Sequence, residues 1–512
     1  MSHTPFSDLF VEPEDPFVEN SFAIRSAKCI FDEKTRQLMN RTLLSAILSL
    51  SIPVISAAQN TVPVSFDLNY SDAENILSPL TVKVGNALPL QSKPRPEREG
   101  YRFAGWYTSP DCREGDEWLF GNNSVGFYTQ PTDSMAVKGE MTLYAKWVSP
   151  TPVRTAQDLD DMRNDLSGWY VLENDIDLSG ILNWVPVGEY EAHYEFAPGE
   201  WWVKAFKGRL EGNGHTIRGL HMTQLLTDKS GLFGACANAQ ILGVKMEDTL
   251  IEMTAEKPYV APLAGILKQD DGAVAEIRSC NIANTTIKVR TTNKESTFHS
   301  FTGLCGGAWG GYIGQNTVSG KMDLQIAGEG GGELYVGAFL GEAYNDTVGC
   351  VSDYEINITF TNPTAKELKA YIGALQASAT NVDSSVAMGS INLSGFSGSK
   401  EIYVGGLIGS ERYGTVKSSR SSVRITEKKV PSIQIGGIVG EFNQGYGMIG
   451  AAFGTKTTLL NWCTFTGKVT TDDNDTVVFG EICGGGQPEP LSSPWGLSMD
   501  YSIRNCKYEP AE

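Results

Sequence analysis

GLFG, at residues 231–234, recurs in varied form seven times further along the chain. The later copies are PLAG (262–265), GLCG (303–306), AFLG (338–341), ALQA (374–377), GLIG (406–409), GIVG (437–440) and EICG (481–484). Successive copies lie 31 to 44 residues apart. Self-similarity at such a period is typical of repeat architectures, in which each unit buries its apolar face by stacking on its neighbours. The repeat therefore decides the fold of the C-terminal part of the chain.

The unit that begins at Tyr403 shows the local structure expected of each repeat. It reads YVGGLIGSERYGTVKSSRSSVRI, with short apolar runs between turns rich in Gly and Ser. Three short strands in such a unit fit one coil of a right-handed parallel β-helix. A propeller blade needs four antiparallel strands in roughly 40 to 50 residues, so an eight-bladed propeller is the weaker alternative. We expect a mainly β protein with a solenoid of about eight coils.

The composition indicates soluble globular domains. The chain has 512 residues, of which 41% are hydrophobic and 20% are charged, which is long enough for two or three domains. Its formal net charge is −19. Because an acidic chain repels phosphate backbones, a nucleic-acid partner is not expected.

Residues 39–58 have the layout of a secretory signal peptide. From Met39 the chain reads MNRTLLSAILSLSIPVISAAQN, with one arginine, an uncharged apolar run from Leu43 to Ile55, and small residues before Gln59. The run is too short to span a bilayer comfortably, so a buried helix or a short anchor is the weaker alternative. We expect translation to start at Met39, residues 1–38 to be an upstream extension or a disordered tail, and the mature chain to have no stable membrane span.

Two aromatic elements mark a first mature domain at residues 59–148. They are GYRFAGWY (100–107) and TLYAKW (142–147), and a period-two strand, VPVSFDLNY (62–70), precedes them. This segment resembles the Listeria-Bacteroides repeat, the B-repeat of internalin-like bacterial surface proteins. It departs from that pattern in a longer middle, DEWLFGNNSVGFY (116–128). The resemblance implies a small β-grasp-like spacer or binding module and no catalysis.

Trp118 and Tyr128 are the candidate ligand contacts of this domain. Flat aromatic faces can stack on a ligand such as a sugar. The alternative is that both rings belong to the core. For Trp106 and Trp147 we expect the core, because a domain this small needs large side chains to fill its interior.

The segment from residue 151 leads into the repeat as part of one domain, 151–512. Leu159, Met162 and Leu166 fall on one helical face, with Thr155 as the expected N-cap, and this helix is expected to cap the solenoid. DIDL (175–178), WVPVG (184–188) and FKGRLEGNGHTIRGL (206–220) follow. This order resembles bacterial proteins with the GLUG motif, which is also found beside the peptidase portion of some immunoglobulin A peptidases. The resemblance implies stacked G-L-F-G units and is weakest at 374–377, where both glycines are absent.

Eight of the nine cysteines follow the signal peptide, and none forms a C-x-x-C pair, which argues against a zinc or redox motif. Cys280, Cys463 and Cys506 recur at one phase of the repeat, with Cys350 nearby. We expect these cysteines to be small buried residues stacked in a column. A bond between Cys463 and Cys506 is the exception to test, because export permits disulfides and the two lie in successive coils.

The chain lacks the motifs of common catalytic centres. None of its five histidines lies in an H-E-x-x-H motif, and no G-x-S-x-G is present. His215 and His221 are expected at turn or packing positions. Asp175 and Asp177 lie two apart on a strand and could bind calcium, but bonding to local backbone donors is the favoured role. No catalytic residue, metal or cofactor is therefore assigned.

We expect an exported cell-surface or secreted repeat protein with a non-enzymatic adhesin or binding role towards glycans or host or cell-surface proteins. By resemblance alone, its source is a Gram-negative, Bacteroides-like bacterium. The loop-decorated side of a solenoid offers an extended contact surface, and the expected ligand-binding segments are 289–301 and 446–460. The alternative is a carbohydrate-active β-helix enzyme, a polysaccharide lyase or hydrolase that uses groove carboxylates such as Asp353 and Glu355.

Overall fold

The computed structural model describes most of the chain from Thr61 onward. The described residues are 61–71, 77–88, 92–113, 116–118, 120, 136–190, 202, 204–226, 229–270, 273–295, 297–361, 368–395, 401–411, 414–430, 433–442, 459–472, 477–485 and 502–509. They belong to a single compact unit, Thr61–Glu512. The expected signal peptide and the residues before it lie outside this description. Among the described residues, no helix is long and apolar enough to cross a bilayer.

The first structural element of this unit is a small mixed sheet. Its strands are β1 (Thr61–Asp67), β2 (Leu80–Lys83), β3 (Arg102–Tyr107) and β4 (Met141–Val148), in the order β2-β1-β4-β3. The central pair β1–β4 is parallel and the two outer pairs are antiparallel. Val64 and Phe66 are buried on one side of β1, as its period-two pattern predicts. The small β-rich module expected before the solenoid is thus present.

Aromatic rings fill the core of this sheet. Trp106 is fully buried, and its ring meets Phe66 and Phe103 at centroid distances of 4.8 and 5.3 Å. Trp147 is only partly buried, packs against the same core, and donates from Nε1 to the Leu68 carbonyl at 2.6 Å. Edge-to-face packing of this kind adds to the area that the rings bury. The core role predicted for Trp106 is confirmed, and Trp147 packs at the margin of that core.

A short capped helix begins the second part of the fold. Helix α3 (Ala156–Asp160) continues into the 3₁₀ helix η3 (Asp161–Asn164). Thr155 is the N-cap: its side chain accepts from the Asp158 N–H, and the Asp158 side chain accepts from the Thr155 N–H. Leu159 and Met162 on its inner side are fully buried in the main hydrophobic core. The predicted helix, its N-cap and the buried Leu159 and Met162 are confirmed, whereas Leu166 lies beyond the helix end at Asn164 and is only partly buried.

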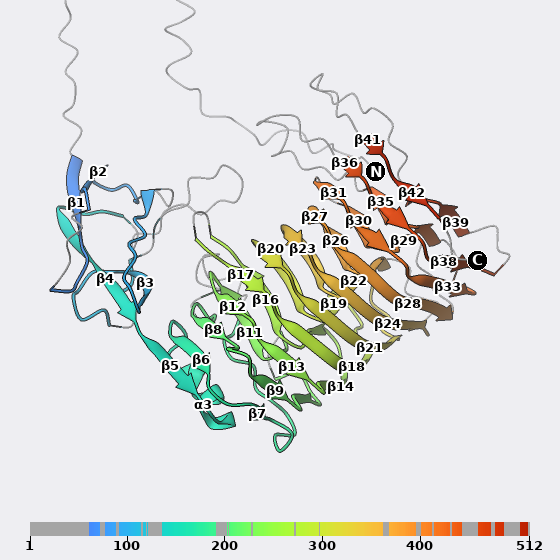
Figure 1. Ribbon diagram of the computed structural model, residues 1–512, viewed down its shortest axis with the longest axis horizontal. Helices are drawn as coiled ribbons and strands as arrows, with labels where there is room; N and C mark the ends of the chain where they lie inside the picture. Colours follow the sequence, from blue (N-terminus) through green and yellow to red (C-terminus); the bar gives the residue numbers. More distant parts are fainter. Residues whose placement is uncertain are drawn as a thin grey trace, which may run out of the picture. The chain divides into compact units, whose positions relative to one another are not determined.

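The remainder is a parallel β-solenoid built from three sheets (Figure 1). The 17-stranded sheet contains β5 (Pro150–Val153), β6 (Trp169–Leu172), β8 (Arg209–Glu211), β11 (Phe233–Ala237), β12 (Gln240–Leu242), β16 (Ala264–Lys268), β17 (Glu276–Arg278), β20 (Cys305–Gly314), β23 (Leu340–Val348), β26 (Gln376–Ala379), β27 (Asn381–Asp383), β30 (Ile408–Glu411), β31 (Thr415–Lys417), β35 (Val439–Phe442), β36 (Leu459–Asn461), β40 (Cys483–Gly485) and β41 (Ser502–Arg504). The 14-stranded sheet contains β7 (Ile176–Asp177), β9 (Thr216–Arg218), β10 (His221–Met222), β13 (Lys245–Glu247), β14 (Leu250–Ala255), β18 (Asn281–Thr291), β21 (Thr317–Ile326), β24 (Val351–Phe360), β28 (Val386–Gly395), β32 (Arg420–Ser421), β33 (Arg424–Lys428), β37 (Thr464–Phe465), β38 (Lys468–Thr470) and β42 (Lys507–Tyr508). The 7-stranded sheet contains β15 (Tyr259–Val260), β19 (Thr297–Thr302), β22 (Gly332–Gly337), β25 (Leu368–Gly373), β29 (Glu401–Gly405), β34 (Ile433–Gly436) and β39 (Val477–Gly480).

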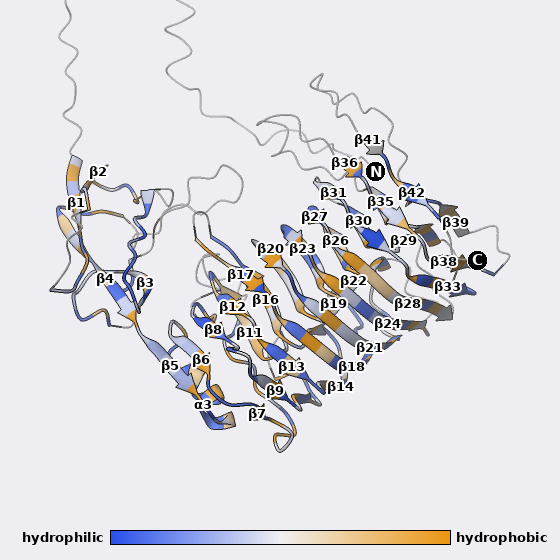
Figure 2. Ribbon diagram, viewed as in Figure 1, coloured by the Kyte–Doolittle hydropathy of each residue, from blue (hydrophilic) through white to orange (hydrophobic). Residues whose placement is uncertain are grey.

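Strands of successive coils pair in parallel through these sheets, wherever the chain is described. This pairing excludes the antiparallel blades of the propeller alternative. Along β24 the burial alternates with period two, so one side of each strand faces a shared core and the other faces outward. Apolar and polar residues are accordingly interleaved along the solenoid strands (Figure 2). The right-handed sense and the number of eight coils stay predictions.

The last position of each repeated motif is the second residue of a strand in the 17-stranded sheet, just after the corner with the 7-stranded sheet. A Cβ at Gly306 would come within 2.4 Å of the Gly265 carbonyl oxygen, and one at Gly440 within 2.5 Å of the Gly409 carbonyl oxygen. Backbone atoms yield little to such a contact, so glycine is favoured there. Ala377, the exception in the motif, packs its side chain among the buried rings of three tyrosines. The repeat is therefore explained by close backbone stacking at this corner.

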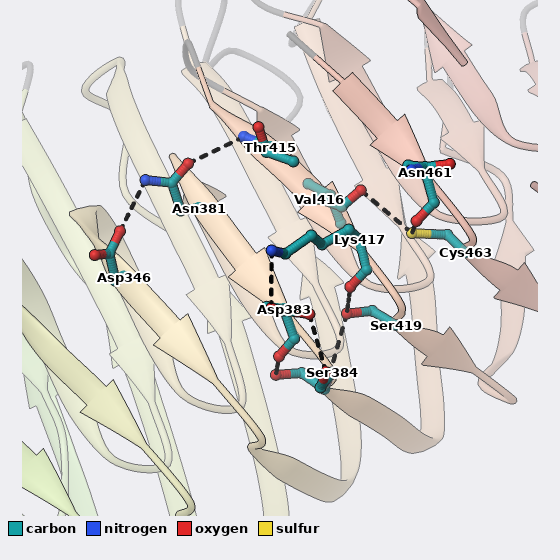
Figure 3. A network of polar contacts seen from close by, with 11 residues as sticks. Asp346, Asn381, Asp383, Ser384, Thr415, Val416, Lys417, Ser419, Asn461 and Cys463 are labelled. Atoms are coloured by element: carbon teal, nitrogen blue, oxygen red, sulfur yellow. Dashed lines mark hydrogen bonds and ion pairs between the residues drawn. The ribbon is translucent and has the colours of Figure 1, made fainter. Parts of the chain in front are cut away.

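A second corner, between the 17-stranded and 14-stranded sheets, carries the cysteine column. The first corner residue has a positive φ, as in Ser384 (51°) and Ser418 (51°), and the next side chain points inward. The inward residues of successive coils are Cys280, Asn316, Cys350, Ser385, Ser419, Cys463 and Cys506. Figure 3 shows part of this corner, where the Cys463 thiol lies 3.6 Å from the carbonyl oxygens of Val416 and Asn461. The predicted column is confirmed, with the correction that Cys350 belongs to it and does not merely lie nearby.

The two segments expected to hold ligand-binding insertions do not have the predicted character where they are described. Residues 289–301 supply the end of β18 and most of β19, which are regular strands of the solenoid wall. The expected irregular structure of this segment was wrong, because a longer step between motifs can lengthen strands as well as loops, and its ligand-binding role stays a prediction. Residues 446–458 lie outside the described part of the chain, and the segment 446–460 ends in β36.

Candidate functional site

The structure places Trp118 inside the small domain. The side chain is 8% exposed and belongs to the same core as Trp106 and Leu143. A ring in that position has no free face on which a ligand could stack, so its burial favours the core alternative. Tyr128, the other candidate ligand contact, lies outside the described residues.

The carboxylates of Asp175 and Asp177 serve the backbone at a turn. Asp175 Oδ1 accepts from the Thr216 N–H at 3.0 Å and lies 3.4 Å from His215 Nδ1, while Asp177 Oδ1 accepts from the Ser179 N–H at 2.9 Å. The backbone bond from Thr216 holds the pKa of Asp175 below its ordinary value. The two acids and His215 thus make the local contacts expected of structural residues.

The outer face of the 14-stranded sheet presents rows of polar side chains. One row runs across neighbouring strands in register: Glu252, Lys288, Asp323, Asn357, Asn392, Thr426 and Thr470. Asn357 donates from Nδ2 to Asp323 Oδ1 at 2.8 Å, and Asn392 donates to Asn357 Oδ1 at 2.8 Å. A parallel row two residues further along each strand holds Thr254, Arg290, Gln325, Thr359 and Ser394. Neighbouring strands lie about 4.8 Å apart, so these rows repeat a donor or acceptor at that spacing.

A groove opens on this face over β14, β18 and β21. It encloses about 510 Å³, and its polar lining includes Thr223, Glu252, Lys288, Arg290, Asp323 and Gln325. Within it Lys288 Nζ lies 3.5 Å from Glu252 Oε2, and Arg290 donates to Gln325 at 3.4 Å. Positively charged, negatively charged and neutral polar side chains therefore line one recess. They offer both hydrogen-bond donors and acceptors, which suits a ligand rich in hydroxyl groups.

Asp353 and Glu355, named for the enzyme alternative, are exposed on β24 of the same face. Glu355 accepts from Asn357 at 2.9 Å and pairs with Lys321 at 3.1 Å. The Asn357 hydrogen bond, followed by that of Lys321, holds the pKa of Glu355 below its ordinary value. A carboxyl held in its ionised form is poorly suited to donate a proton, so Glu355 does not fit the acid of a hydrolase.

A ladder of tyrosines fills the corner beside the glycine column. Tyr335, Tyr371 and Tyr403 stack on successive coils with centroid distances of 5.4 and 5.8 Å, and they are at most 8% exposed. Beyond them Glu441 accepts from Ser410 Oγ at 3.3 Å. Burial is the main cause that raises the pKa of Glu441 above its ordinary value. A carboxyl whose pKa is raised in this way holds its proton to higher pH than an exposed one.

Sequence reasoning missed the polar rows and the tyrosine ladder. Successive members of these rows lie 34 to 36 residues apart, with one step of 44, but this spacing alone does not say which side of a strand a residue occupies. A clearer signal was the tyrosine that precedes three successive motifs: Tyr335 in YVGAFLG, Tyr371 in YIGALQA and Tyr403 in YVGGLIG. That recurrence could have identified the ladder before the structure did.

Fold and surface together define a class: a parallel β-solenoid preceded by a small mixed-sheet module. Residues 63–146 match the family model of the Listeria-Bacteroides repeat domain, which covers the small module and not the solenoid. No curated protein sequence matches the chain.

Two solved structures are similar to this chain at 13% sequence identity. A proposed immunoglobulin A1 protease from Bacteroides ovatus aligns with 70% of this chain and 84% of its own, with a TM-score of 0.36. A structure described as an IgA1 protease aligns with 72% of this chain and 27% of its own, with a TM-score of 0.34.

Proposed function

We propose that this chain is an exported surface or secreted protein of the GLUG-motif type that binds glycans without modifying them. The observation that carries the proposal is the outer face of the 14-stranded sheet, where polar rows run across at least six strands and a groove opens among them. The Listeria-Bacteroides repeat domain at residues 63–146 supports an extracellular or surface setting, because repeats of this type belong to bacterial surface proteins.

The physical argument rests on spacing and preorganisation. Asp323, Asn357 and Asn392 are linked from coil to coil by hydrogen bonds, so their side chains are already ordered before a ligand arrives. A preordered surface loses less conformational entropy on binding, and its remaining donors and acceptors can bond to sugar hydroxyls. A flat parallel sheet repeats these groups every 4.8 Å or so, which suits an extended polymer better than a compact ligand.

A glycan array probed with the full exported chain tests this proposal. We expect binding to at least one class of polysaccharide, and we expect the double variant Asp323→Ala, Asn357→Ala to weaken it by about tenfold. The matched control is Asn381→Ala on the 17-stranded sheet, where Asn381 Nδ2 donates to Asp346 Oδ1 at the same 2.8 Å (Figure 3). Silence on the array, or equal loss in the control, would count against this surface.

The second candidate is a carbohydrate-active enzyme, a lyase or hydrolase, and the raised pKa of Glu441 is the observation that favours it. Such an enzyme would release new reducing ends or unsaturated products from a polysaccharide panel. Loss of that turnover in Glu441→Gln, with folding intact, would replace the binding proposal by the enzymatic one.

A further inference from the structure

The last described strands of the 14-stranded sheet carry a concentration of positive charge in an acidic protein. Arg420 on β32, Arg424 and Lys428 on β33, and Lys468 on β38 are all exposed. None of the four makes an ion pair with another described residue. The chain as a whole has a net charge of −19, so this surface, here called the basic patch, has the opposite sign to the molecule that bears it.

The register brings the cations of the basic patch together. Arg424 pairs directly with Lys468, so two like charges occupy neighbouring strands about 4.8 Å apart at the backbone. Like charges placed opposite each other in a sheet are destabilising. The partners of Arg424 and Lys428 on β28 are Ser390 and Ser394, which carry no charge. The arrangement therefore has an electrostatic cost that no described neighbour offsets.

Among the described residues, the acidic side chains close to the patch in sequence form no ion pair with its four cations. Glu427 points inward, is 1% exposed, and accepts from the Val430 N–H. Glu509 lies 3.5 Å from Lys507 on β42. Asp472, two residues beyond β38, is exposed and makes no described ion pair with the four cations. A bound anion would relieve the repulsion that remains.

Trp462 supplies a second, independent observation at the corner that leads into β37. Its side chain is 61% exposed, and its backbone has φ 57°. The equivalent corner residues in other coils are small or flexible: Ser279, Gln315, Gly349, Ser384, Ser418 and Asn505. A bulky residue at positive φ is an outlier, and an exposed indole has no packing role that would justify it. Two residues after Trp462, Thr464 pairs with Arg420, so the indole borders the patch.

We propose that the basic patch and Trp462 form a binding site for an acidic polysaccharide, whose charged groups are carboxylates or sulfates. The guanidinium groups of Arg420 and Arg424 and the ammonium groups of Lys428 and Lys468 donate to those anionic groups. The indole stacks on the apolar face of a sugar ring. Thr426, Thr470 and Asn392 lie in one row between the cations and bond to hydroxyls. This proposal rests on the glycan-binding function proposed above and names the class of glycan.

A polysaccharide fits better than a nucleic acid because the row between the cations offers hydroxyl and amide groups suited to sugar hydroxyls. A single indole at the corner also provides one stacking surface, whereas single-stranded nucleic acids are held by several aromatic platforms.

Direct binding measurements on the full chain test the site. The probes are polygalacturonate for carboxylates, dextran sulfate for sulfates, neutral dextran, and single-stranded DNA of similar length. We expect the protein to bind one or both acidic polysaccharides, to bind neutral dextran and DNA at least about tenfold more weakly, and to lose affinity as salt is raised.

Two sets of variants locate the effect. Arg424→Glu with Lys468→Glu should weaken binding of the acidic polysaccharide by about tenfold or more. The matched control, Lys369→Glu with Lys417→Glu, reverses two exposed cations on the 7-stranded and 17-stranded sheets, away from the polar rows, and we expect less than about threefold change. Trp462→Asn, which installs the residue found at this corner as Asn505, should weaken polysaccharide binding several-fold without lowering the melting temperature.

The outcomes separate this site from the function on which it rests. Glycan binding on the array with no preference for acidic polymers would overturn the site and leave the binding function standing. Equal affinity for DNA and the acidic polysaccharides, or equal loss in both charge-reversal pairs, would also overturn it. Because charge reversal can unfold a protein, the neutral pair Arg424→Gln with Lys468→Gln is measured as well, and an unchanged affinity there would count against the site.

Discussion

The two ends of one sheet face, built on the same backbone, differ in how they arrange charge. Near β14, β18 and β21, two lysines are paired with acids: Lys288 lies 3.5 Å from Glu252, and Lys321 lies 3.1 Å from Glu355. Arg290 on β18 bonds to the neutral Gln325. Near β33 and β38, Arg424 stands beside Lys468 with no such partner among the described residues. Because a parallel in-register sheet places equivalent positions side by side, one substitution per coil is enough to turn a neutral surface into a charged one.

This difference shows that, in a solenoid, the inward residues maintain the fold while the outward residues can vary. The inward columns of the described coils hold mainly apolar residues, with a few buried polar ones such as Asn316 and Glu427, in one continuous core that includes Val153 near its start and Phe465 near its end. The outward columns vary freely, since each contacts only its neighbours in the preceding and following coils. Function can therefore differ from one end of the same face to the other without a change of fold.

The largest expected effect breaks the scaffold that both ends share. Gly440→Val would place a side chain 2.5 Å from the Gly409 carbonyl oxygen and 2.7 Å from the Val404 nitrogen. We expect a loss of about 3 kcal/mol or more in the free energy of unfolding, because backbone atoms on both sides cannot move apart. Hydrogen exchange should show lost protection in β34, β35 and β39, while β11 to β17 keep theirs.

The control for this substitution is Ala377→Gly at the equivalent position, which should change stability by about 1 kcal/mol or less. Uniform loss of protection along the whole solenoid would show that the two ends unfold as one unit. It would then be wrong to treat them as independent regions.

The next largest effect concerns a covalent link at the C-terminal end alone. The Cys463 and Cys506 positions are neighbours in register, and contact with the Cys506 thiol, together with burial, raises the pKa of Cys463. In an oxidising compartment, we expect the two thiols to lose two electrons and two protons to the disulfide of an exchange partner and form a bond. That bond should stabilise the last coils by roughly 2–4 kcal/mol.

Non-reducing peptide mapping of the exported protein checks this expectation. The internal control is the pair Cys280 and Cys350. Asn316, on the coil between them, keeps the two thiols apart, so both should be found as free thiols. Free Cys463 and Cys506 in the exported protein would remove the link.

A smaller effect is expected from pH, because the pKa values of Glu441 and Glu355 are shifted in opposite directions. The pKa of Glu441 is raised in the folded state. Its favourable contribution to the free energy of unfolding is therefore complete below pH 4.5, the pKa of the unfolded chain, and is lost as pH rises through the folded pKa. The pKa of Glu355 is lowered, so its contribution is present above 4.5 and is lost as pH falls through the folded pKa. Glu441→Gln should therefore gain stability relative to the parent as pH rises, and Glu355→Gln should lose it.

Urea unfolding of both variants and the parent at about pH 4 and about pH 7 measures the two trends. Trends of the same sign in the two variants would contradict the assignment. Such a result would mean that Glu441, beside the tyrosine ladder, is no more shielded from water than Glu355 on the open face.

The smallest expected effect concerns the paired end. Lys321→Ala removes the ion pairs to Glu355 at 3.1 Å and to Asp323 at 3.5 Å, all on an exposed surface. We expect less than about 1 kcal/mol of lost stability and no change in the binding of acidic polysaccharide, because surface ion pairs contribute little. A larger loss, measured by thermal unfolding, would show that the paired end depends on its charges for folding.

Much of the scaffold was predictable because it rests on local rules. The capping box at Thr155 and Asp158 and the buried Leu159 and Met162 follow from residue types at helical spacing. Binding sites were predicted poorly. Trp118 was a candidate for its aromatic face, yet the structure buries it, because a sequence shows that a ring is large but not which side of it other residues cover.

By itself, the sequence determined the repeat, the small sheet with its aromatic core, and the column of cysteines, since each depends on which residues recur at one phase of a coil. Only the tertiary structure decided which outward residues stand next to each other. Arg424 and Lys468 are 44 positions apart in the chain and adjacent in the sheet, whereas Lys321 and Glu355 are 34 positions apart and form an ion pair. Loops of different length connect the coils, so only the hydrogen-bonded register between neighbouring strands fixes which charges face each other.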